Sequence, residues 1–559
     1  MANFTNVLFS LYKENPDKIC LIFVRSNFPD TSITYRELLE NSAVYANKYR
    51  ERGIEPGDVV ILILQHSIEL IYAYFGAVLN GSIPSILPFL TEKLLPDRYR
   101  SDLTSLIAIT HPSAIVTYRD FQNEVKQATK EGDLVREILI VEDFDGKKPI
   151  DISTLGGFNR KSSDIALLQH SSGSTGLQKG VALSHESVMN QLLSYGSILQ
   201  LDTQHDVIVS WLPLYHDMGL IACFLMPILR NIPLVLLSPF EWVRAPHKLL
   251  EAVTKYKGTL TWLPNFAFNF CAQKIRDRYL EAIDLGSWRA VINCSEPTRA
   301  ESHEAFYKRF KKYGLKESVL NTCYAMAENV FAVTQSPLNQ DPLIDVIDRN
   351  SFQVEKIAVP SFKGDTIRML SAGKTIPGVK VKIINEKGDI LNDRHIGQVA
   401  INSNCMLSEY FNRPNETRKA FLDGWYLTGD FGYLVDEELF ITGRMKDLII
   451  VGGKNVYPQD IEQLAMEIQG IHPGRVVAFG IFNDEAGTED VVLIAETSEI
   501  ETLKREELAN KIRKIVTTGS AIALRQVILV DRKWLIKTSS GKIARSANKE
   551  KYIKEFINS

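Results

Sequence analysis

Short apolar segments alternate with longer segments of helical periodicity over much of the chain. Runs such as "VVILIL" from Val59, "SAIVTY" from Ser113 and "IPLVLL" from Ile232 have the length and composition of buried strands. Between such runs lie segments such as "TYRELLENSAVYANKYRERG", in which apolar residues recur every three or four positions. Buried strands in alternation with amphipathic helices predict an α/β fold whose β-sheets are flanked by helices.

The length of the chain and a change of texture near Arg444 indicate more than one domain. A chain of 559 residues exceeds what a single hydrophobic core supports. After Arg444 the strand-like runs "RVVAFGIF", "DVVLIAE" and "QVILV" are separated by two helix-like segments, which is typical of a small α+β domain. We therefore predict a large N-terminal domain of several subdomains over residues 1–444 and a small C-terminal domain over residues 445–559.

Between Val330 and Gly373 the sequence has little periodicity and several turn residues. A stretch of this length without regular structure inside a compact domain is usually functional or an insertion. We predict an insertion at about residues 333–372.

Charge, cysteine usage and hydropathy argue against several classes of protein. The 64 basic and 67 acidic residues give a formal charge of -3, so nucleic acid is not expected as a partner. The six cysteines form no CxxC pair and the histidines form no HExxH motif, which disfavours a disulfide framework and a structural zinc site. No signal-peptide pattern is present, and the longest apolar run falls short of the roughly 20 residues that span a bilayer. We expect a cytoplasmic protein without a transmembrane segment.

The segment "QHSSGSTGLQKGVALSH" has the glycines, hydroxyls and lysine of a phosphate-binding loop. It is not a Walker A loop, because Gln178 precedes Lys179 and Gly180 follows it, where that loop needs glycine before the lysine and serine or threonine after it. The strand-like "GVAL" and the helix-capping Ser184 predict a loop between two strands, followed by a helix. Backbone N–H groups, hydroxyls and Lys179 would then hold phosphate, and a flexible surface turn is the alternative.

Four segments together resemble the adenylate-forming superfamily, which includes acyl-CoA synthetases, luciferases and nonribosomal peptide adenylation domains. They are "SSGSTGLQKG", "CYAMAENVF", "GWYLTGDFGYL" and "KTSSGKIARSA", in the order of the superfamily. Each has an ordinary explanation by itself, such as a core tyrosine, a Gly-Asp turn or a solvated lysine. Together the resemblance implies a large adenylating domain, a small mobile C-terminal domain, and ATP with Mg²⁺ as cofactors.

The same resemblance implies roles for individual residues. Lys542 would be the catalytic lysine that contacts the substrate carboxylate and the α-phosphate, Glu328 would bind Mg²⁺, and Lys446 would be the hinge. Tyr324 would stack on adenine, and Asp430 would accept hydrogen bonds from the ribose. The complete set of expected nucleotide-binding residues is Ser171, Ser172, Gly173, Ser174, Thr175, Gly176, Lys179, Ser295, Glu296, Pro297, Tyr324, Asp430 and Arg444.

The acyl side of the site is less defined by sequence. His216 and Asp217 in "YHDMG" and Met326 in "AMAE" are the candidate substrate-binding residues. For Asp217 the alternative is a cap on the following apolar helix. That helix, "LIACFLMPIL", would line a tunnel for an alkyl chain or simply belong to the core.

Several segments resemble the fatty acyl-AMP ligases more than the acyl-CoA synthetases: "WLPLYHDMGL", "LPNFAF", "NCSEP", "AMAE" and "KDLIIVGGKNVYPQDIE". The match runs from about Thr34 to Arg545. The excursion after Glu328 is longer than acyl-CoA synthetases usually show, and in the ligases such an insertion is held to disfavour thioester formation with coenzyme A. Ile450 replaces a lysine that those synthetases typically carry, although strand core would also explain an apolar residue there.

These resemblances imply an enzyme that activates a fatty acid with ATP, releases pyrophosphate and transfers the acyl group to the phosphopantetheine thiol of an acyl carrier protein, in polyketide, nonribosomal peptide or lipid biosynthesis. The carrier is expected in trans, because Asn159 in "LGGFN" replaces the serine of a carrier motif. The first alternative is an acyl-CoA synthetase. The second is a catalytically silent adenylate-binding module, which the presence of Glu328, Asp430 and Lys542 disfavours.

Overall fold

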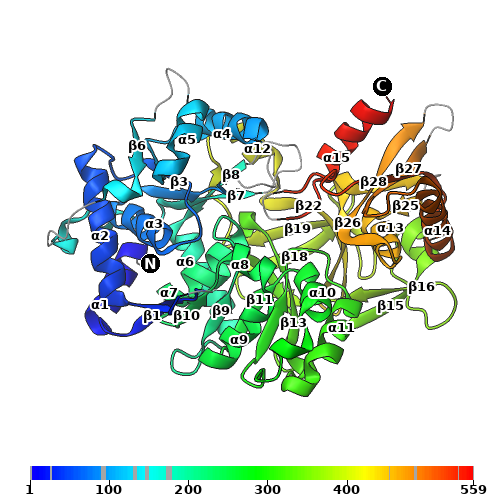
Figure 1. Cartoon of the computed structure of the whole chain (residues 1–559), viewed down its shortest axis with the longest axis horizontal. Coiled ribbons are helices and arrows are strands. Elements are labelled where there is room, and N and C mark those ends of the chain that lie inside the picture. Colours follow the sequence, from blue (N-terminus) through cyan, green and yellow to red (C-terminus); the bar gives the residue numbers. More distant parts are fainter. Residues whose placement is uncertain are drawn as a thin grey trace.

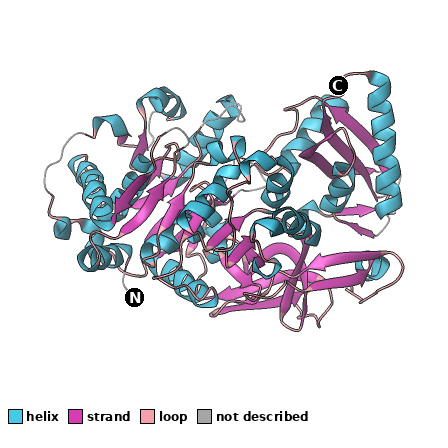
Figure 2. Cartoon of the chain, turned by 60° about the horizontal axis from the view of Figure 1, so that its bottom comes forward, coloured by secondary structure: helices cyan, strands magenta, loops and turns pink. Residues whose placement is uncertain are grey.

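The structure is a computed structural model that describes residues 3–25, 28–89, 96–129, 135–144, 150–171, 179–451, 454–483, 488–520, 522–538 and 541–557. Figure 1 shows the N-terminal helices and sheets at one end of the molecule and the elements from α13 (Pro458–Met466) onward at the other. Helices lie against the sheets throughout, as Figure 2 shows by secondary structure. The α/β class expected from the alternating pattern is confirmed.

The largest sheet has nine strands in the order β17-β14-β13-β12-β11-β9-β10-β1-β2. Neighbours from β13 to β1 are parallel, whereas β2, β14 and β17 add antiparallel edges. The central strands are buried along their whole length, as expected for parallel strands covered by helices. The strands are β1 (Ile19–Phe23), β2 (Thr31–Thr34), β9 (Ile208–Ser210), β10 (Leu234–Leu236), β11 (Leu260–Leu263), β12 (Ala290–Asn293), β13 (Leu320–Ala325), β14 (Ala332–Gln335) and β17 (Lys374–Thr375).

Two smaller sheets belong to the same part of the chain. A four-stranded parallel sheet has the order β4-β3-β5-β6, and a three-stranded antiparallel sheet has the order β20-β8-β7. The predicted strand-loop-strand arrangement around the glycine-rich segment is confirmed, since β7 and β8 are antiparallel neighbours. The strands are β3 (Val59–Leu62), β4 (Ile83–Ile86), β5 (Ala114–Thr117), β6 (Glu137–Ile140), β7 (Ile165–Ser171), β8 (Lys179–Ser184) and β20 (Glu409–Tyr410).

The stretch between Val330 and Gly373 is more regular than its sequence indicates. After β14 the chain forms an antiparallel pair, β15 (Ile344–Asp348) and β16 (Thr366–Leu370), whose connection contains the π-helical turn η10 (Ser351–Glu355). Each of these strands buries a single residue, so the alternation that marks a strand in sequence is weak. The insertion boundaries stay a prediction.

A five-stranded antiparallel sheet leads from the large domain to the C-terminal region. β18, β19, β22 and β21 pair in this order, and β23 adds to β22. Its last strand, β23, ends at Arg444, the residue at which the texture of the sequence changes. The strands are β18 (Val379–Ile384), β19 (Gly397–Ser403), β21 (Phe421–Leu422), β22 (Trp425–Val435) and β23 (Glu438–Arg444).

The region after Arg444 has hydrophobic clusters of its own. A hairpin of β24 and β25 precedes a three-stranded sheet in the order β26-β27-β28, and α13 and α14 pack on that sheet. A second cluster on the other face contains Phe479, Leu535 and Tyr552. The strands are β24 (Ile449–Val451), β25 (Lys454–Val456), β26 (Ile471–Asn483), β27 (Thr488–Thr497) and β28 (Leu524–Val530).

Several α-helices begin at a residue whose side chain accepts a backbone N–H of the first turn. Ser184, for example, accepts the N–H of Ser187 and starts α6 in a capping box, as the sequence predicts. The apolar segment at Met218 forms a π-helix, η5 (Met218–Leu225), that continues into α7. Within the described ranges, none of the helices combines the length and the apolar character needed to cross a bilayer. The α-helices are α1 (Phe4–Glu14), α2 (Tyr35–Glu51), α3 (Ile68–Asn80), α4 (Pro96–Thr110), α5 (Gln122–Ala128), α6 (His185–Ile198), α7 (Met226–Leu229), α8 (Pro239–Arg244), α9 (His247–Tyr256), α10 (Asn265–Lys274), α11 (Ala300–Phe310), α12 (Pro414–Lys419), α13 (Pro458–Met466), α14 (Thr502–Ser520) and α15 (Arg545–Tyr552).

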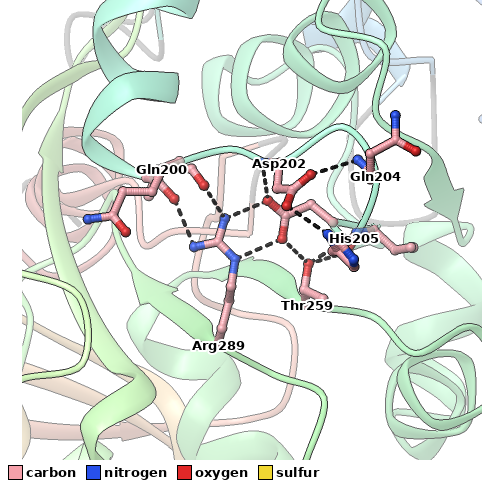
Figure 3. Close-up of polar contacts among 9 residues, drawn as sticks. Gln200, Asp202, Gln204, His205, Thr259 and Arg289 are labelled. Atoms are coloured by element: carbon pink, nitrogen blue, oxygen red, sulfur yellow. Dashed lines mark hydrogen bonds and ion pairs between the residues drawn. The ribbon is translucent and has the colours of Figure 1, made fainter.

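An ion pair joins the amino ends of three central strands. Asp206 precedes β9, Thr259 precedes β11 and Arg289 precedes β12. Arg289 donates from Nε and Nη2 to the two carboxylate oxygens of Asp206, at 2.7 and 2.6 Å, and the hydroxyl of Thr259 donates to Oδ1 at 2.8 Å. Arg289 also reaches the carbonyl of Gln200 (Figure 3). Burial alone raises the pKa of the Asp206 carboxyl, but the hydrogen bonds, first that from Arg289, hold this pKa below its ordinary value.

Candidate active site

The candidate residues gather at the carboxyl ends of the parallel strands, opposite the ion pair of Asp206. His216 and Asp217 follow β9, Ser295 and Glu296 follow β12, and Glu328 follows β13. In open parallel sheets ligands bind outside the carboxyl ends of the strands, because the connecting loops converge there. The topology therefore brings together residues that lie more than a hundred positions apart in sequence.

Tyr324 and Arg444 both contact the carboxylate of Asp430, the first through a hydrogen bond and the second through an ion pair. The hydroxyl of Tyr324 donates to Oδ2 of Asp430 at 2.6 Å, and Nε of Arg444 lies 3.4 Å from Oδ1. The register of β22 and β23 places Asp430 opposite Arg444. Burial, and then the charge of Asp430, raises the pKa of Tyr324, so the hydroxyl stays a donor. Sequence reasoning gave Tyr324 an adenine-stacking face and missed that its hydroxyl orients the carboxylate.

Tyr410 links Glu328 to Lys179 and was missed by sequence reasoning. Its hydroxyl donates to Oε1 of Glu328 at 2.9 Å, and Nζ of Lys179 lies 4.5 Å from the centre of its ring. Tyr410 reaches this position because β20 pairs with β8, where it stands opposite Val181. Burial raises the pKa of the Glu328 carboxyl, and the charge of Asp217 adds to this effect while the bond from Tyr410 opposes it. The only sequence signal is a tyrosine in "SEYFN", a segment that contains no glycine and matches no motif.

The backbone after Glu328 is strained. The 3₁₀ turn η9 (Ala327–Asn329) is followed by Val330 at φ 62 and ψ -55, and the N–H of Phe331 donates to the carbonyl of Asn329 at 2.6 Å. This is a γ-turn of the rare form, here centred on a buried β-branched residue. Such strain persists only where the surroundings over-determine the conformation, and it is common at active sites. Glu328 lies two residues before this strained position, and its Oε1 accepts the hydroxyl of Tyr410.

Asp217 occupies the cap position that was the alternative to a binding role. Its Oδ1 accepts the N–H of Met218 at 2.7 Å at the start of η5, and it lies 2.6 Å from Nδ1 of His216. Burial alone raises the pKa of the Asp217 carboxyl, but the adjacent His216, and then the charge of Lys542, lowers it below the ordinary value. Asp217 thus stays anionic close to both Glu328 and Lys542. A role for His216 and Asp217 toward substrate stays a prediction.

Lys542 enters the site from the C-terminal region. Its Nζ donates to the carbonyl of Ser295 at 2.6 Å. Burial lowers the pKa of Lys542, against the effect of the negative charges of Glu296 and Asp217. Ser295 adopts φ 68, a left-handed conformation that turns the chain after β12 and exposes its carbonyl to the lysine. Lys542, the catalytic lysine expected from the last signature, therefore contacts the turn in the segment "NCSEP".

The loop that carries Lys542 is fixed at its base. Thr538 and Lys542 exchange two hydrogen bonds, from the N–H of Thr538 to the carbonyl of Lys542 at 2.8 Å and from the N–H of Lys542 to the Thr538 hydroxyl at 3.2 Å. Arg545, three residues on, binds Asp447 at 2.8 Å and Glu462 at 2.7 Å. Asp447 directly follows the expected hinge residue, Lys446, which is exposed in the turn η11 (Met445–Asp447).

The remaining candidates vary in how much the structure says of them. Met326 is half-buried and its N–H donates to the carbonyl of Phe331 at 2.9 Å. Pro297 is exposed beside Glu296, whose Oε2 accepts the N–H of Phe266 at 3.0 Å. In the phosphate loop only the strand ends are described, with Ser171 opposite Lys179 in the ladder. The other predicted loop residues lie outside the described residues, namely Ser172, Gly173, Ser174, Thr175 and Gly176.

A divalent cation fits this site only if a ligand supplies most of its oxygens. The described ranges contain no group of three or more His, Cys, Asp or Glu side chains arranged to hold a metal. Glu328 offers one carboxylate, which Tyr410 orients through Oε1. Mg²⁺ is commonly held by one or two carboxylates together with substrate phosphates and waters, and Glu328 fits that pattern.

Comparison with known proteins agrees with this geometry. Residues 10–411 match the family described as AMP-binding enzyme. The chain is 30% identical to the medium-chain-fatty-acid acyl-carrier-protein ligase JamA of Moorena producens, over 93% of this chain and 90% of that protein. It is 28% identical to the long-chain-fatty-acid AMP ligase FadD32 of Mycobacterium marinum, over 89% of this chain and 85% of that protein.

A solved structure is similar over the whole length. It comes from structural and functional studies of fatty acyl-adenylate ligases from E. coli and L. pneumophila and aligns with a TM-score of 0.90 at 26% identity, covering 100% of this chain and 99% of that one. The arrangement of a large N-terminal part and a small C-terminal part is shared with such adenylating enzymes. The family match covers more than half of the chain and contains the first two of the four signatures. The chain therefore belongs to the AMP-binding enzyme family.

Proposed function

We propose that this protein activates a fatty acid with ATP to an acyl-adenylate, releases pyrophosphate, and transfers the acyl group to the phosphopantetheine thiol of a separate acyl carrier protein. The observation that carries the proposal is the contact of Lys542 Nζ with the Ser295 carbonyl, beside the acidic groups of Glu296 and Asp217. It brings Lys542 of the last signature to the carboxyl ends of the parallel strands. The relatives named for fatty-acid AMP ligation support the substrate class.

In the first step a carboxylate oxygen of the acid attacks the α-phosphorus of ATP. A P–O bond forms, the bond from the α-phosphorus to the bridging oxygen breaks, and pyrophosphate leaves with that electron pair. Lys542 supplies a compact positive charge with several N–H donors, which can contact the carboxylate and the α-phosphate together. The protein contributes mainly position and charge neutralisation, as in other phosphoryl-type transfers.

The nucleotide would be held by three groups of residues. Asp430, fixed by Tyr324 and Arg444, accepts hydrogen bonds from the ribose hydroxyls, a task for an ionised carboxylate. Lys179 and the loop before it bind the phosphates that leave as pyrophosphate. Glu328 would hold Mg²⁺, which when bound neutralises charge on the phosphate oxygens. Tyr410 keeps the Glu328 carboxylate in one orientation for that purpose.

The acceptor is inferred from the face of the small domain. Ile450 is 51% exposed, so strand core does not explain the apolar residue at this position. Its N–H donates to Oε2 of Glu489 at 2.7 Å, which places a carboxylate rather than a lysine beside β24. Coenzyme A carries phosphates that a carboxylate repels, whereas the phosphopantetheine arm of a carrier protein presents fewer. One relative is named as an acyl-carrier-protein ligase, which supports this acceptor. We further propose that the reaction takes place in the cytoplasm.

The proposal is tested by incubating the protein with ATP, Mg²⁺ and fatty acids of graded length, with either coenzyme A or a holo acyl carrier protein as acceptor. We expect pyrophosphate release with at least one chain length and transfer to the carrier in preference to coenzyme A. Efficient acyl-CoA formation would instead identify an acyl-CoA synthetase. If no acid supports pyrophosphate release, the protein is a silent binding module.

Lys542→Ala gives the matching test of mechanism. Because the lysine acts on the reacting groups and not on adenine or ribose, adenylate formation should fall by about 100-fold or more while ATP affinity changes by less than about threefold. Stopped-flow or exchange assays measure the first quantity and calorimetric titration the second. Equal losses in adenylate formation and in ATP affinity would show that Lys542 contributes to ATP binding and not to the chemical step.

A further inference from the structure

One loop of the large domain receives two contacts from the small domain. The loop runs from Cys294 to Arg299, between β12 and α11. At its start the Ser295 carbonyl accepts Nζ of Lys542 at 2.6 Å. At its end Arg299 donates from Nη2 to Oδ1 of Asp460 at 2.9 Å and to the carbonyl of Gln459 at 3.2 Å. Asp460 and Gln459 lie in the first turn of α13.

The loop is rigidly attached to the large domain. Oδ1 of Asn265, at the start of α10, accepts the backbone N–H of Arg299 at 3.2 Å and Nδ2 of Asn293 at 2.9 Å. The carboxylate of Glu296 accepts the N–H of Phe266 at 3.0 Å. The strand residue before the loop, the middle of the loop and its last residue are therefore all bonded to the start of α10, so Arg299 has a defined position relative to the sheet.

The small domain is equally rigid between its two contacts. Arg545 joins the base of the Lys542 loop to α13 through Glu462 at 2.7 Å, and its Nε donates to the carbonyl of Ala478 in β26 at 2.9 Å. Its side chain is only 17% exposed, and it also binds Asp447 beside the hinge. Because α13 and the Lys542 loop are held together in this way, the position of Asp460 determines the position of Lys542.

We propose that Arg299 and Asp460 are positioning residues, whose ion pair holds the small domain in the orientation that places Lys542 in the adenylating site. The two side chains are 25% and 30% exposed, so water screens the pair less than an exposed one. The pair stabilises the arrangement for the first step and opens when the small domain moves for the second. This inference rests on the proposed function, because it assigns the pair to one of its two steps.

The test reverses the charges separately and together. Arg299→Asp and Asp460→Arg each replace attraction by repulsion, and the double variant restores attraction in the opposite sense. We expect each single variant to lower kcat of fatty-acid-dependent ATP–pyrophosphate exchange by about tenfold or more, with KM for ATP changed by less than about twofold. The double variant should return to within about threefold of the unmodified protein.

The second step gives a readout that a merely structural role would not produce. With synthetic acyl-adenylate and pantetheine as the thiol, sulfur attacks the acyl carbon, the bond to AMP breaks, and the thiol proton passes to solvent. The single variants should perform this transfer at least as fast as the unmodified protein. Glu304→Ala is the matched control, because Glu304 lies in α11, the helix that follows Arg299, and its ion pair is with Arg368 of β16 in the large domain. Its exchange rate should stay within about twofold.

Amide hydrogen exchange tests the same inference without any turnover. In Asp460→Arg, exchange in residues 294–299 and 541–545 should be faster than in the unmodified protein, and it should be slow again in the double variant. Unchanged exchange in the single variants, or equal loss of both half-reactions without recovery in the double variant, would overturn the inference. If the unmodified protein releases no pyrophosphate, the proposed function fails. The amide hydrogen exchange of the variants still decides whether the ion pair of Arg299 and Asp460 holds the two domains together.

Discussion

At the scale of single residues, the most informative side chain is one that no motif marked. Tyr410 connects the carboxylate of Glu328 with the ammonium of Lys179, so one ring contacts both the expected metal ligand and the expected phosphate lysine. Its hydroxyl also lies 2.8 Å from that of Tyr426. Removal of the hydroxyl alone separates these contacts, because the ring that Lys179 faces would remain.

Tyr410→Phe should therefore weaken the binding of Mg²⁺ more than the binding of the ATP phosphates. Loss of a hydrogen bond to a charged group costs about 1.5–3 kcal/mol, so we expect a roughly tenfold or larger increase in the Mg²⁺ concentration needed for half-maximal pyrophosphate release. The measurement is a Mg²⁺ titration at saturating ATP. Tyr426→Phe, which leaves the bond to Glu328 in place, should shift the midpoint by less than about threefold. An identical Mg²⁺ dependence in Tyr410→Phe would contradict this role.

The sequence could predict residues that lie within recognisable signatures but not their partners. Lys542, Asp430 and Glu328 each stand in a segment with a characteristic local pattern. Tyr410 and Arg299 have no such pattern, and their importance arises from contacts with residues 82 and 161 positions away. Such long-range contacts form only in the folded chain, so a single sequence does not reveal them. The conformation of the segment containing Ser172–Gly176, which the sequence singled out first, lies outside the described residues.

At the scale of elements, the amino ends of β9, β11 and β12 depend on one carboxylate. The side chain of Asp206 is buried, with Asp206 only 3% exposed, and its carboxylate accepts hydrogen bonds from Arg289 and Thr259. Removing one partner of a buried pair leaves the other charge uncompensated, which typically costs several kcal/mol. None of these residues approaches Lys542 or Glu328, because they lie at the opposite ends of the strands.

Asp206→Asn should lower stability without altering catalysis. We expect the free energy of unfolding, measured with urea at pH 7, to fall by about 3 kcal/mol. KM for ATP should stay unchanged. The folded-state pKa of Asp206 lies below its unfolded value, so this contribution is present above about pH 4 and is lost as the pH falls through the lower, folded-state pKa. The difference between the urea midpoints of the two proteins should therefore be largest near pH 7 and should shrink progressively as the pH is lowered below about 4. His205→Gln, at a side chain that is 83% exposed, should change the midpoint little.

The same scale shows which elements sequence periodicity can predict. The central strands and α6 follow their patterns because burial is continuous along them. β15 and β16 do not, because each buries a single residue and gains its stability from pairing and from Arg368, which binds Glu301 and Glu304. Tertiary contacts outweigh local preference in such strands.

At the scale of the whole molecule, the junction between the large and small domains is closely packed. A Cβ atom on Gly443 would lie 2.8 Å from Cδ1 of Tyr457 and 2.8 Å from Nε2 of Gln459. Gln459 can move, but the Tyr457 ring cannot move freely, because it packs against Phe352 and its hydroxyl meets Thr442. The orientation that brings Lys542 to Ser295 therefore requires glycine at position 443.

Gly443→Ala should disturb the first half-reaction selectively. The added methyl group separates β23 from the start of α13, so ATP–pyrophosphate exchange should fall by about tenfold while transfer from preformed acyl-adenylate to a thiol changes by less than about threefold. Gly432→Ala is the control, because its Cβ would lie 2.6 Å from the carbonyl of Phe440 within the large domain. That variant should lose stability and leave the ratio of the two rates unchanged. If the ratio of ATP–pyrophosphate exchange to thiol transfer fell in both variants, the selective role of Gly443 in the first half-reaction would be contradicted.

The separation between the two ends of the parallel strands bears on how this protein can diverge. Substitutions around Asp206 should change how much folded protein a cell retains, whereas substitutions around Glu328 and Ser295 should change how fast the acid is activated. Variation at one end can thus accumulate without cost at the other. A library selected first for abundance and then for faster activation should yield changes at the amino ends of these strands in the first round and at their carboxyl ends in the second.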